Sequence, residues 1–509
     1  MVASEVIATK SRGPRTRFTA LRTGSTMKTS HQETFTQRAA KAHRAAQSAS
    51  IASGHGIYLG HRGGDWMFAP PEQSVLVLGP PRSGKTSSLI IPNLLVASGP
   101  AVSTSTKPDV MATTATARSR VGECLIFDPA GATDAPGGLR PIRWSPIQAC
   151  HTWDGALSAA RSLVAVGMAS TSGPTGAVRH DHWSERAEAL IAPLLHAAAR
   201  DGADMRTVLS WIDRRRALPA QQILAAAPGD AAGLAADLLN GVTCTDEREL
   251  SGIWSTASGA VGGYRTERAL ATTADPDFDP AAFVESSDTL YICASGRRQG
   301  LVAPMVVGII EDVRTATYDS RAHRQPVADR RPPVLLALDE AANIAPLPDL
   351  PSMVSEGGGQ GLTTLACFQD LSQAKQRWGH AADGFLSLFG TTVVLPGIGD
   401  VVTLDALSVL AGEEEVGTRS LSSGRTPTGR TLSDAVTGGA LRHTLTSATV
   451  RRRRLPPDVI TRGRPEHALA FDEHNQVGWV PLSPSHGTEL WQTITGPTRH
   501  RGLVRDVGR

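Results

Sequence analysis

The sequence has no apolar run long enough to span a membrane. Its longest apolar runs, Leu301–Ile310 and Ala189–Ala199, fall well short of the ~18 residues that a transmembrane helix requires, and no secretory signal opens the chain. The five cysteines are widely scattered and never take the C-x-x-C spacing, which argues against disulfides and zinc sites. These absences predict a protein of the reducing cytoplasm, with no transmembrane segment in this chain.

Charge is distributed unevenly along the chain. A hydrophobic fraction of 40% and a charged fraction of 19% are typical of a soluble globular protein, and 509 residues are enough for two or three domains. Residues 1–50 carry nine Lys or Arg against two Glu, so the rest of the chain is net negative. We expect this basic, Ser- and Thr-rich start to be a disordered tail. The alternative is an arm that contacts anionic lipid or DNA phosphate.

A phosphate-binding loop is encoded within Ser74–Asn93, where an apolar strand, a glycine-rich loop and a helical run follow one another. Gly79, Gly84, Lys85 and Thr86 fit the pattern G-x-x-x-x-G-K-[ST], which predicts nucleotide binding. The glycines permit positive φ and close approach to an anion. Lys85 adds a charge between the outer phosphates, and the Thr86 hydroxyl suits Mg²⁺. The predicted binding residues are Gly79, Pro80, Pro81, Arg82, Ser83, Gly84, Lys85, Thr86 and Ser87.

Two carboxylates end a second apolar strand, in the segment VLLALDE. In a nucleotide-hydrolysing site Asp339 would hold the Mg²⁺ shell and Glu340 would polarise the attacking water. Gln369, after the strand LTTLACF, could bond the γ-phosphate or the water, or could be a solvated strand-end side chain. Asp128 is either a turn residue or a site-edge acid, and His180–His182 lack a third group of metal ligands. The predicted catalytic residues are Lys85, Glu340 and Gln369, and the predicted metal ligands are Thr86 and Asp339.

The order of apolar runs predicts an α/β fold with a mainly parallel sheet and an inserted all-α domain. The strand candidates are Val75–Leu78, Ala101–Ser105, Cys124–Phe127, Thr289–Ala294, Val334–Leu338, Leu362–Phe368, Thr391–Leu395 and Ala468–Phe471. We expect a basic tail at 1–55, nucleotide-binding parts at 56–150 and 272–484, a helical insert at 151–271 and a tail at 485–509. Residues 416–450 have no clear period and are predicted to be a mobile loop, whose arginines could contact nucleic acid.

These segments together resemble the TraG/TraD-like coupling proteins of type IV secretion and, more broadly, the FtsK/HerA-type motors. The matching pieces cover most of residues 60–480 and are GPPRSGKTSSLIIPNLL, STSTKPDV with CLIFDP, HWSERAEALIAPLLHAA, and LLALDEAANIAPLPDLPSMVSEGGGQGLTTLACFQDLSQAKQRWG. The resemblance implies a RecA-like nucleotide domain that uses ATP and Mg²⁺ and works as a homo-hexamer around DNA. It also implies that ATP hydrolysis drives DNA toward a secretion channel, and that the insert recognises the relaxosome or other cargo.

The sequence departs from the family pattern at its start, because family members usually carry membrane helices before the nucleotide domain. We therefore expect a soluble variant, a truncated reading frame or a protein recruited to the inner face of the membrane by a partner. Two rival functions also remain open. One is a nucleotide-gated docking protein with little hydrolysis, and the other is a chromosomal or plasmid DNA motor outside secretion.

A second departure concerns an arginine that the family often places after the acidic pair, where it reaches the neighbouring subunit's ATP. Here the segment Gly357–Gly361 reads GGGQG. Such an arginine can be worth about 10³ to 10⁵ in rate, so turnover depends on whether Arg297, Arg298 or Arg377 replaces it. The family's Asp-Pro-Lys-Gly-Glu is also changed to DPAGA at residues 128–132.

Overall fold

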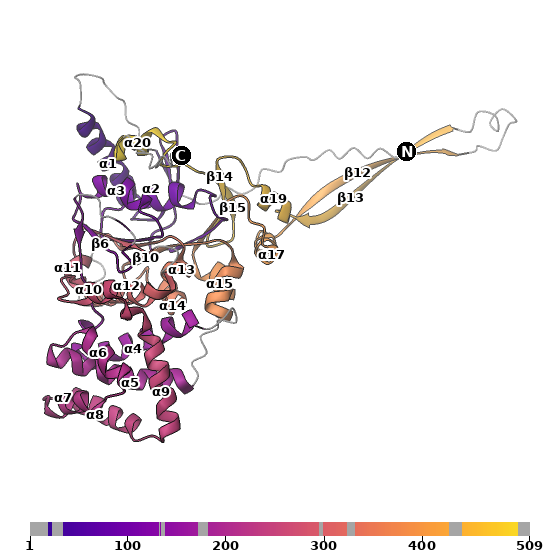
Figure 1. Ribbon diagram of the computed structural model, residues 1–509. Helices are drawn as coiled ribbons and strands as arrows, with labels where there is room; N and C mark the ends of the chain where they lie inside the picture. Colours follow the sequence, from indigo (N-terminus) through magenta and orange to yellow (C-terminus); the bar gives the residue numbers. More distant parts are fainter. Residues whose placement is uncertain are drawn as a thin grey trace, which may run out of the picture.

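A ten-stranded, mainly parallel sheet forms the centre of the molecule (Figure 1). The structure is a computed structural model that describes residues 19–22, 34–131, 133, 138–171, 182–294, 299–322, 331–426 and 440–496. The strand order across the sheet is β15 (Val477–Pro481), β14 (His467–Phe471), β11 (Thr391–Val394), β4 (Val75–Leu78), β10 (Leu362–Phe368), β9 (Val334–Leu338), β5 (Ala101–Ser105), β8 (Thr289–Cys293), β6 (Cys124–Phe127) and β7 (Arg140–Pro141). The β11–β14 and β14–β15 pairs are antiparallel, and the other pairs are parallel.

The eight strands predicted from the sequence all belong to this sheet, with ends within one residue of the prediction. Every residue of β4 is buried, because layers of helices cover both faces of the sheet. Val75 and Val77 pack into one hydrophobic cluster, and Leu76 and Leu78 pack into the other on the opposite face. The prediction of an α/β fold with a mainly parallel sheet is confirmed.

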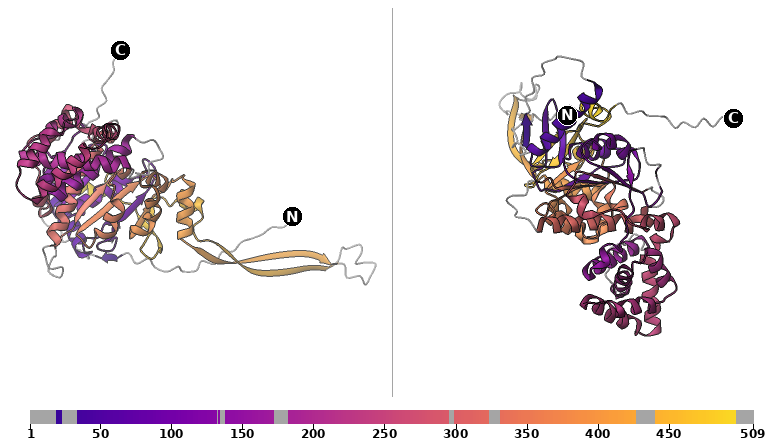
Figure 2. Two further views of the ribbon diagram at one scale, coloured as in Figure 1. Left: turned by 90° about the horizontal axis from the view of Figure 1, so that it is seen from below. Right: turned by 90° about the vertical axis from the view of Figure 1, so that its left-hand side faces the viewer.

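Helices fill the two layers on either side of the sheet (Figures 1 and 2). The helices of the nucleotide-binding parts are α1 (Phe35–Ala52), η1 (Thr86–Ile90), α2 (Ile91–Val96), α3 (Asp109–Arg118), α11 (Pro280–Val284), α12 (Gln299–Ala322), α13 (Ala341–Ile344), α14 (Leu350–Glu356), α15 (Leu371–Trp378), η4 (Gly379–Gly384), α16 (Phe385–Leu388), α17 (Val401–Leu410), α19 (Pro457–Arg462) and α20 (Glu489–Thr495). None of the helices in the described ranges is long and apolar enough to cross a bilayer.

The insert consists of helices and lies below the sheet in Figure 1. Its elements are η2 (Ala149–His151), α4 (Trp153–Thr171), α5 (His182–Asp201), α6 (Met205–Asp213), α7 (Leu218–Ala226), α8 (Asp230–Thr243), α9 (Glu247–Ala260), η3 (Gly262–Arg265) and α10 (Glu267–Thr273). One hydrophobic cluster runs from the sheet through α12 into α4 and α5. The insert therefore packs on the nucleotide-binding parts through a shared core.

The expectation of a disordered tail at 1–55 is wrong for residues 35–52, which form the helix α1. Thr34 and Gln37 cap this helix reciprocally, and His43 bonds the Leu95 carbonyl oxygen at 2.9 Å. The buried side of α1 consists mainly of alanines, and a stripe of small residues gives little hydrophobic signal in the sequence. Burial and the nearby Arg118 charge lower the pKa of His43 to about 4.

The segment 485–509 also contains regular structure, because α20 buries Trp491 and Ile494. The expectation of a tail is therefore wrong for residues 489–495. This helix packs beside α1 and a small antiparallel sheet of β1 (Thr19–Arg22), β3 (Asp65–Phe68) and β2 (Tyr58–Arg62). A tight turn joins β2 and β3, with positive φ at Gly63 and Gly64.

The predicted mobile loop at 416–450 is, in its described part, most of a long antiparallel hairpin. Strand β12 (Glu413–Thr426) pairs with β13 (Ala440–Arg453), and the hairpin projects away from the body of the molecule (Figures 1 and 2). Both faces of a two-stranded ribbon meet solvent, so its sequence needs no alternation of apolar and polar residues. The prediction of an irregular loop failed for this reason, and residues 427–439 lie outside the described ranges.

Candidate nucleotide-binding site

The loop after β4 has the backbone geometry of a phosphate cradle. Gly84 has φ +96° and Arg82 has φ +64°, so two residues take the left-handed conformation within three positions. Gly79 does not have positive φ, contrary to the expectation for both glycines. A Cβ atom at Gly79 would lie 3.0 Å from Leu395 Cβ and 2.7 Å from Ser83 Oγ. Close packing of the loop against the end of β11 is therefore the reason for this glycine.

The helix after the loop begins with a π-helical turn, η1, before continuing as α2. The Ile91 N–H donates to the Thr86 carbonyl oxygen, which is an i to i+5 bond. Pro92 lies where the π-turn passes into α2, and the helix continues to Val96. Because proline has no N–H and excludes an ordinary bond to the preceding turn, its position matches the wider turn before it.

Lys85 and Thr86 point toward the partners that a nucleotide site requires. The Lys85 amine donates to the carbonyl oxygens of Gly79 and, at 2.9 Å, Pro80. The Thr86 hydroxyl donates to Asp339 Oδ2 at 2.7 Å, although 253 residues separate the two in sequence. Burial raises the pKa of Asp339 and the Glu340 charge adds to this, whereas the Thr86 bond and the Lys85 charge oppose it.

The strand order brings the acidic pair and Gln369 to this loop. Strand β10 lies between β4 and β9, so Gln369 follows a strand that separates the phosphate loop from Asp339. The Gly79 N–H donates to the Phe368 carbonyl oxygen at 3.1 Å, which joins the loop to the residue before Gln369. The backbone N–H of Gln369 donates to Gln373 Oε1 at 2.9 Å, and the Gln369 side chain is half-buried.

Glu340 has a strained backbone. Its φ of 53° and ψ of 48° are left-handed, and it stands immediately before α13. A non-glycine residue in this conformation costs of order 1 kcal/mol and is common at functional sites. The half-buried side chain follows directly after Asp339. The two carboxylates therefore take different positions, one against Thr86 and one at the start of the helix.

The residues of this site fit a nucleoside triphosphate and Mg²⁺. Ser83 Oγ is buried without a hydrogen-bond partner in the described structure, and the Lys85 amine meets only carbonyl oxygens. Both are donors suited to phosphate oxygens. The described residues hold no group of three or more His, Cys, Asp or Glu that could bind a metal by themselves. Mg²⁺ needs no such cage, because one or two protein oxygens with water and phosphate complete its shell.

The structure adds two contacts that sequence patterns do not indicate. The Thr104 hydroxyl donates to the Asp339 carbonyl oxygen at 3.3 Å, from the end of β5. The Ser485 N–H donates to the Ser87 carbonyl oxygen at 2.9 Å, so the chain returns to the phosphate loop near its C-terminal end. Thr104 lies within the matching segment STSTKPDV and Ser485 lies in no motif, and only the strand order and the course of the chain bring them to the site.

Other predicted site residues lie apart from this group. The carboxylate of Asp128 accepts the N–H and hydroxyl of Thr133 at 2.9 and 3.3 Å. It follows β6, which lies five strand spacings, or roughly 24 Å, from β4. Arg377 is half-buried on α15, where burial lowers its pKa to about 10. His182 lies 3.1 Å from Glu249 Oε1 within the insert, and the other candidates named from sequence, Arg297, Arg298, His180 and Asp181, lie outside the described residues.

The fold and this site define a P-loop nucleotide-binding protein with an inserted all-α domain. A family model described as Type IV secretory system Conjugative DNA transfer matches residues 24–438. The chain belongs to this family, which confirms the resemblance inferred from the sequence.

Two relatives are both the conjugal transfer protein TraG of Escherichia coli. One is 26% identical over 357 residues, covering 64% of this chain and 52% of the relative, and the other is 25% identical over 353 residues, covering 64% and 51%. The chain therefore spans about half the length of the curated relatives it matches.

Similar solved structures include the bacterial conjugative coupling protein TrwBdeltaN70 in an unbound form, with a TM-score of 0.58 and 18% identity over 82% of this chain and 86% of that one. TrwB in complex with ADP and Mg²⁺ has a TM-score of 0.57 and 18% identity over 81% and 86% of the two chains. TrwB with the ATP analogue ADPNP has a TM-score of 0.58 and 19% identity over 81% and 86%. At this level of identity the likeness establishes the fold.

Proposed function

We propose that this chain is an ATP-driven DNA motor, a coupling protein that delivers DNA to a type IV secretion channel. The observation that carries the proposal is the meeting of three chain segments at the ends of adjacent strands, β4, β10 and β9. They place Lys85 and Thr86, Gln369, and the pair Asp339 and Glu340 at one edge of the sheet. Membership of the conjugative DNA transfer family gives this site its proposed cargo.

In the proposed reaction each residue has a separate task. Lys85 exchanges the carbonyl oxygens of Gly79 and Pro80 for phosphate oxygens. Thr86 and Asp339 are the residues that would hold Mg²⁺, which neutralises charge on the phosphates. Glu340 orients and polarises the attacking water, and Gln369 bonds the γ-phosphate or that water. The cofactors proposed for this chain are therefore ATP and Mg²⁺, and the similar TrwB structures contain ADP with Mg²⁺ or the ATP analogue ADPNP.

The proposed assembly is a homo-hexamer around single- or double-stranded DNA. In such a ring the insert would meet the relaxosome or other cargo, and the ring would lie at the inner face of the membrane beside the secretion channel. A membrane partner would hold it there. These partners follow from the family and from the proposed motor activity.

A second candidate function is nucleotide-gated docking with little hydrolysis. The glycine run at 357–361 supports it, because the arginine that would reach a neighbour's ATP is missing there. The run is also packed tightly. A Cβ atom at Gly358 would lie 1.8 Å from the Glu72 carbonyl oxygen, and Gly361 has φ +80°. Close packing and backbone conformation thus explain these two glycines without any role in catalysis.

The test is Mg²⁺-dependent ATPase activity with and without single- and double-stranded DNA. A motor predicts stimulation by DNA and a fall of about 10³-fold in Glu340→Gln, because the water loses its general base. Lys85→Ala should lose ATP binding, whereas Glu340→Gln should keep it. Tight ATP binding with negligible turnover in the natural chain would favour the docking function. ATPase activity that no DNA alters would contradict the motor.

A further inference from the structure

The hairpin of β12 and β13 has no role in the nucleotide site, yet it is the most extended part of the described structure (Figure 2). Its strands have 14 residues each, which corresponds to roughly 45 Å. A two-stranded ribbon is marginally stable by itself in water and leaves unpaired N–H and C=O groups along both edges. A ribbon of this length, whose described strands pair chiefly with each other, therefore indicates a partner.

The first three residue pairs, here called the ribbon base, are electrostatically balanced. Residues 413–415 are all Glu and stand opposite the arginines at 451–453. Arg451 Nε lies 3.2 Å from Glu415 Oε1, and Arg452 Nε lies 3.5 Å from Glu414 Oε1. Arg453 turns instead to Asp405 of α17, at 2.7 Å. Opposite charges across the two strands fix the register and attach the ribbon to the body.

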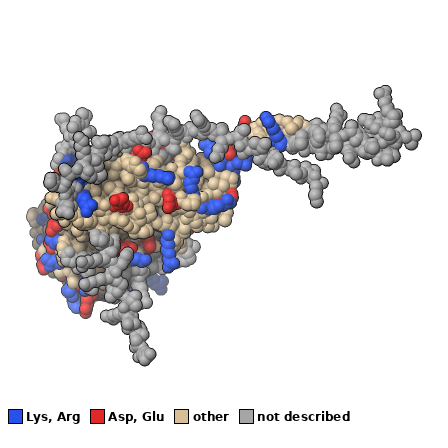
Figure 3. All heavy atoms as spheres, turned by 90° about the horizontal axis from the view of Figure 1, so that it is seen from above, with Lys and Arg blue, Asp and Glu red and all other residues tan. Residues whose placement is uncertain are grey.

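The rest of the ribbon, residues 416–426 and 440–450, is here called the distal ribbon, and its charge is of one sign. It contains Arg419, Arg425 and Arg442 and no Asp or Glu. Arg419 is exposed, and the register places Arg425 opposite Leu441 and Arg442 opposite Gly424. Serines and threonines make up most of its other polar residues. Figure 3 shows the ribbon base, where Lys and Arg side chains lie together with Asp and Glu side chains as the ribbon leaves the body.

This chemistry favours a phosphate backbone over a protein surface. Arginines and hydroxyl side chains are the groups that commonly bond phosphate oxygens, and a two-stranded ribbon fits the major groove of DNA. The cores of protein interfaces are enriched in aromatic residues, and the distal ribbon has none. Its exposed apolar side chains with a described position are few, chiefly Leu445 and Val450.

We propose that the distal ribbon is a nucleic-acid-binding arm that contacts the sugar-phosphate backbone without regard to sequence. The proposal rests on the proposed function for the kind of cargo and adds the element that holds it. The arm is joined to the nucleotide edge, because β11, which pairs with β4, leads through α17 into β12. On the return path the Gly397 N–H donates to the Thr461 carbonyl oxygen at 2.8 Å, so α19 is tied to the segment after β11.

The main test compares DNA affinity across salt concentrations in the full chain and in the triple variant Arg419→Ala, Arg425→Ala, Arg442→Ala. Each lost phosphate contact lowers the slope of log affinity against log salt by about 0.7 to 0.9, so the slope should fall by about 2 to 3. Affinity at 0.1 M salt should fall by about tenfold or more. The triple Arg→Lys variant should keep the slope, because lysine retains the charge.

A charge-matched control is Arg38→Ala, Lys41→Ala, Arg44→Ala on α1, beside the far end of α2 from the phosphate loop. This control should leave the slope unchanged. The natural chain could bind DNA with a steep salt dependence while the triple Ala variant of the ribbon keeps that slope. This result would overturn the proposal that the distal ribbon binds nucleic acid, and it would leave the proposed motor function standing. If the natural chain binds no DNA at all, the proposed function fails together with the arm.

A second variant keeps the ribbon base and replaces residues 416–450 by an Asn-Gly turn, which suits a short hairpin. It should lose as much DNA affinity as the triple Ala variant, with an unchanged molar mass in light scattering. A drop from hexamer to monomer with unchanged DNA affinity would instead assign the ribbon to a second copy of this chain and overturn the proposal. Unchanged thermal unfolding of the body would show that the remaining fold is intact.

Discussion

At the carboxyl edge of the sheet, where β4, β10 and β9 end, polar groups are left without full hydrogen bonding and the backbone is strained. Ser83 Oγ is buried without a partner, and Arg82 and Glu340 take left-handed conformations. At the amino edge His55 and Glu72 also have positive φ, but the largest buried polar group there is fully hydrogen-bonded. Arg118 is fully buried, yet its guanidinium donates to Thr289 Oγ1 at 2.6 Å and to three backbone carbonyl oxygens.

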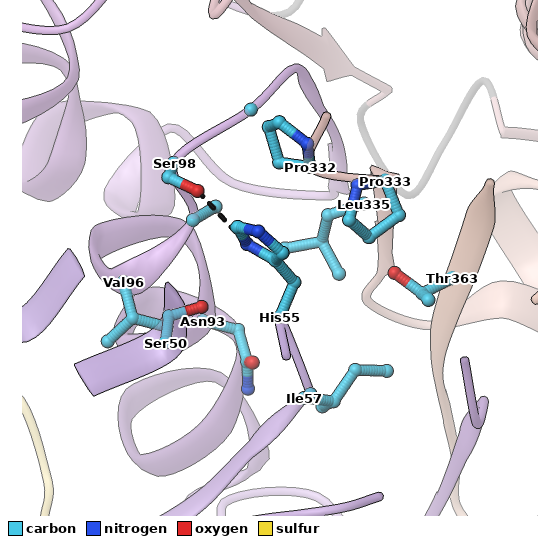
Figure 4. A pocket seen from close by; sticks show the side chains of 13 residues that line it. Ser50, His55, Ile57, Asn93, Val96, Ser98, Pro332, Pro333, Leu335 and Thr363 are labelled. Atoms are coloured by element: carbon cyan, nitrogen blue, oxygen red, sulfur yellow. Dashed lines mark hydrogen bonds between the residues drawn. The ribbon is translucent and has the colours of Figure 1, made fainter. Parts of the chain in front are cut away.

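The surroundings of Arg118 leave little empty space. A small cavity beside it holds about 30 Å³, and His55 within it bonds Ser98 Oγ at 3.2 Å (Figure 4). This is room for about one water molecule rather than a substrate. The comparison shows two uses of buried polar groups. At the carboxyl edge Ser83 Oγ has no partner within the protein and is available to a ligand. At the amino edge Arg118 joins strands and helices through its hydrogen bonds.

The largest expected effect concerns the amino edge. Arg118→Ala removes a donor that satisfies Thr289 and the carbonyl oxygens of Ala97, Gly99 and Ser287. Each buried group left unsatisfied costs about 1 to 3 kcal/mol, so stability should fall by about 5 kcal/mol. Chemical denaturation measures the loss. ATP affinity of the protein that remains folded should be unchanged, and a specific loss of ATP binding would break the comparison between the edges.

The exposed neighbour Arg120 provides the control for this change. Its Nη1 donates to the Ile494 carbonyl oxygen at 3.1 Å at the surface of α20. Arg120→Ala should cost about 1 kcal/mol or less, because solvent can replace the lost donor. Equal losses of stability in the two variants would contradict the view that Arg118 stabilises the fold by satisfying buried polar groups at the strand ends.

A second prediction separates burial from function. Asp312 on α12 has no part in the proposed reaction, accepts a bond from Trp144 Nε1 at 2.7 Å, and has its pKa raised by burial to about 7. The folded chain therefore keeps a proton on Asp312 between its ordinary pKa and about 7, while the unfolded chain has lost it. The contribution of Asp312 to the free energy of unfolding should therefore fall by at most about 3 kcal/mol as the pH rises from 5 to 7, then level off.

Asp312→Asn should reduce the fall in stability between pH 5 and 7 without abolishing it, because the amide does not titrate whereas burial also raises the pKa of the neighbouring Glu311 to about 7. Denaturation midpoints at pH 5, 6, 7 and 8 measure it. An unchanged profile in the variant would show that other groups cause the pH dependence. ATP hydrolysis at constant pH should respond little, since a raised carboxylate pKa away from the nucleotide is no sign of catalysis by itself.

The smallest expected effect concerns strain at the carboxyl edge. Glu340→Gly removes the Cβ atom from a left-handed residue and should raise stability by up to about 1 kcal/mol while abolishing hydrolysis. Glu340→Gln keeps the Cβ atom and should leave stability almost unchanged. Thermal unfolding of the two variants side by side measures the difference. A destabilised glycine variant would show that Glu340 is not strained in the folded chain.

The sheet was predictable from the sequence because its central strands are buried on both faces. Such strands consist of short apolar runs, for example Val75–Leu78 and Leu362–Phe368. The phosphate loop was predictable because its chemistry restricts residue types. The hairpin was not predictable, since the side chains described on its two strands, at 413–419 and 445–453, are exposed or half-buried. The helix α1 was missed because its buried side consists mainly of alanines.

The order of the strands in the sheet could not be predicted from the sequence, and part of the site depends on that order. The apolar runs do not say that β10 lies between β4 and β9, so the place of Gln369 next to both loops could be predicted only by resemblance. The residue type at Gly79 was explained by backbone conformation, whereas the structure explains it by contact with Leu395. Contacts between distant segments, such as Ser485 with Ser87, leave no local pattern.

The position of β4 in the sheet has a consequence for biosynthesis. Both of its neighbours, β10 and β11, are encoded roughly 280 residues or more after it. At about 5 to 20 residues per second, a ribosome needs roughly 15 to 60 seconds to reach them. During this time the first apolar strand stays without its final partners, while the insert can fold from contacts that are local in sequence. A growing chain of this protein should therefore depend on chaperones most strongly before β10 emerges.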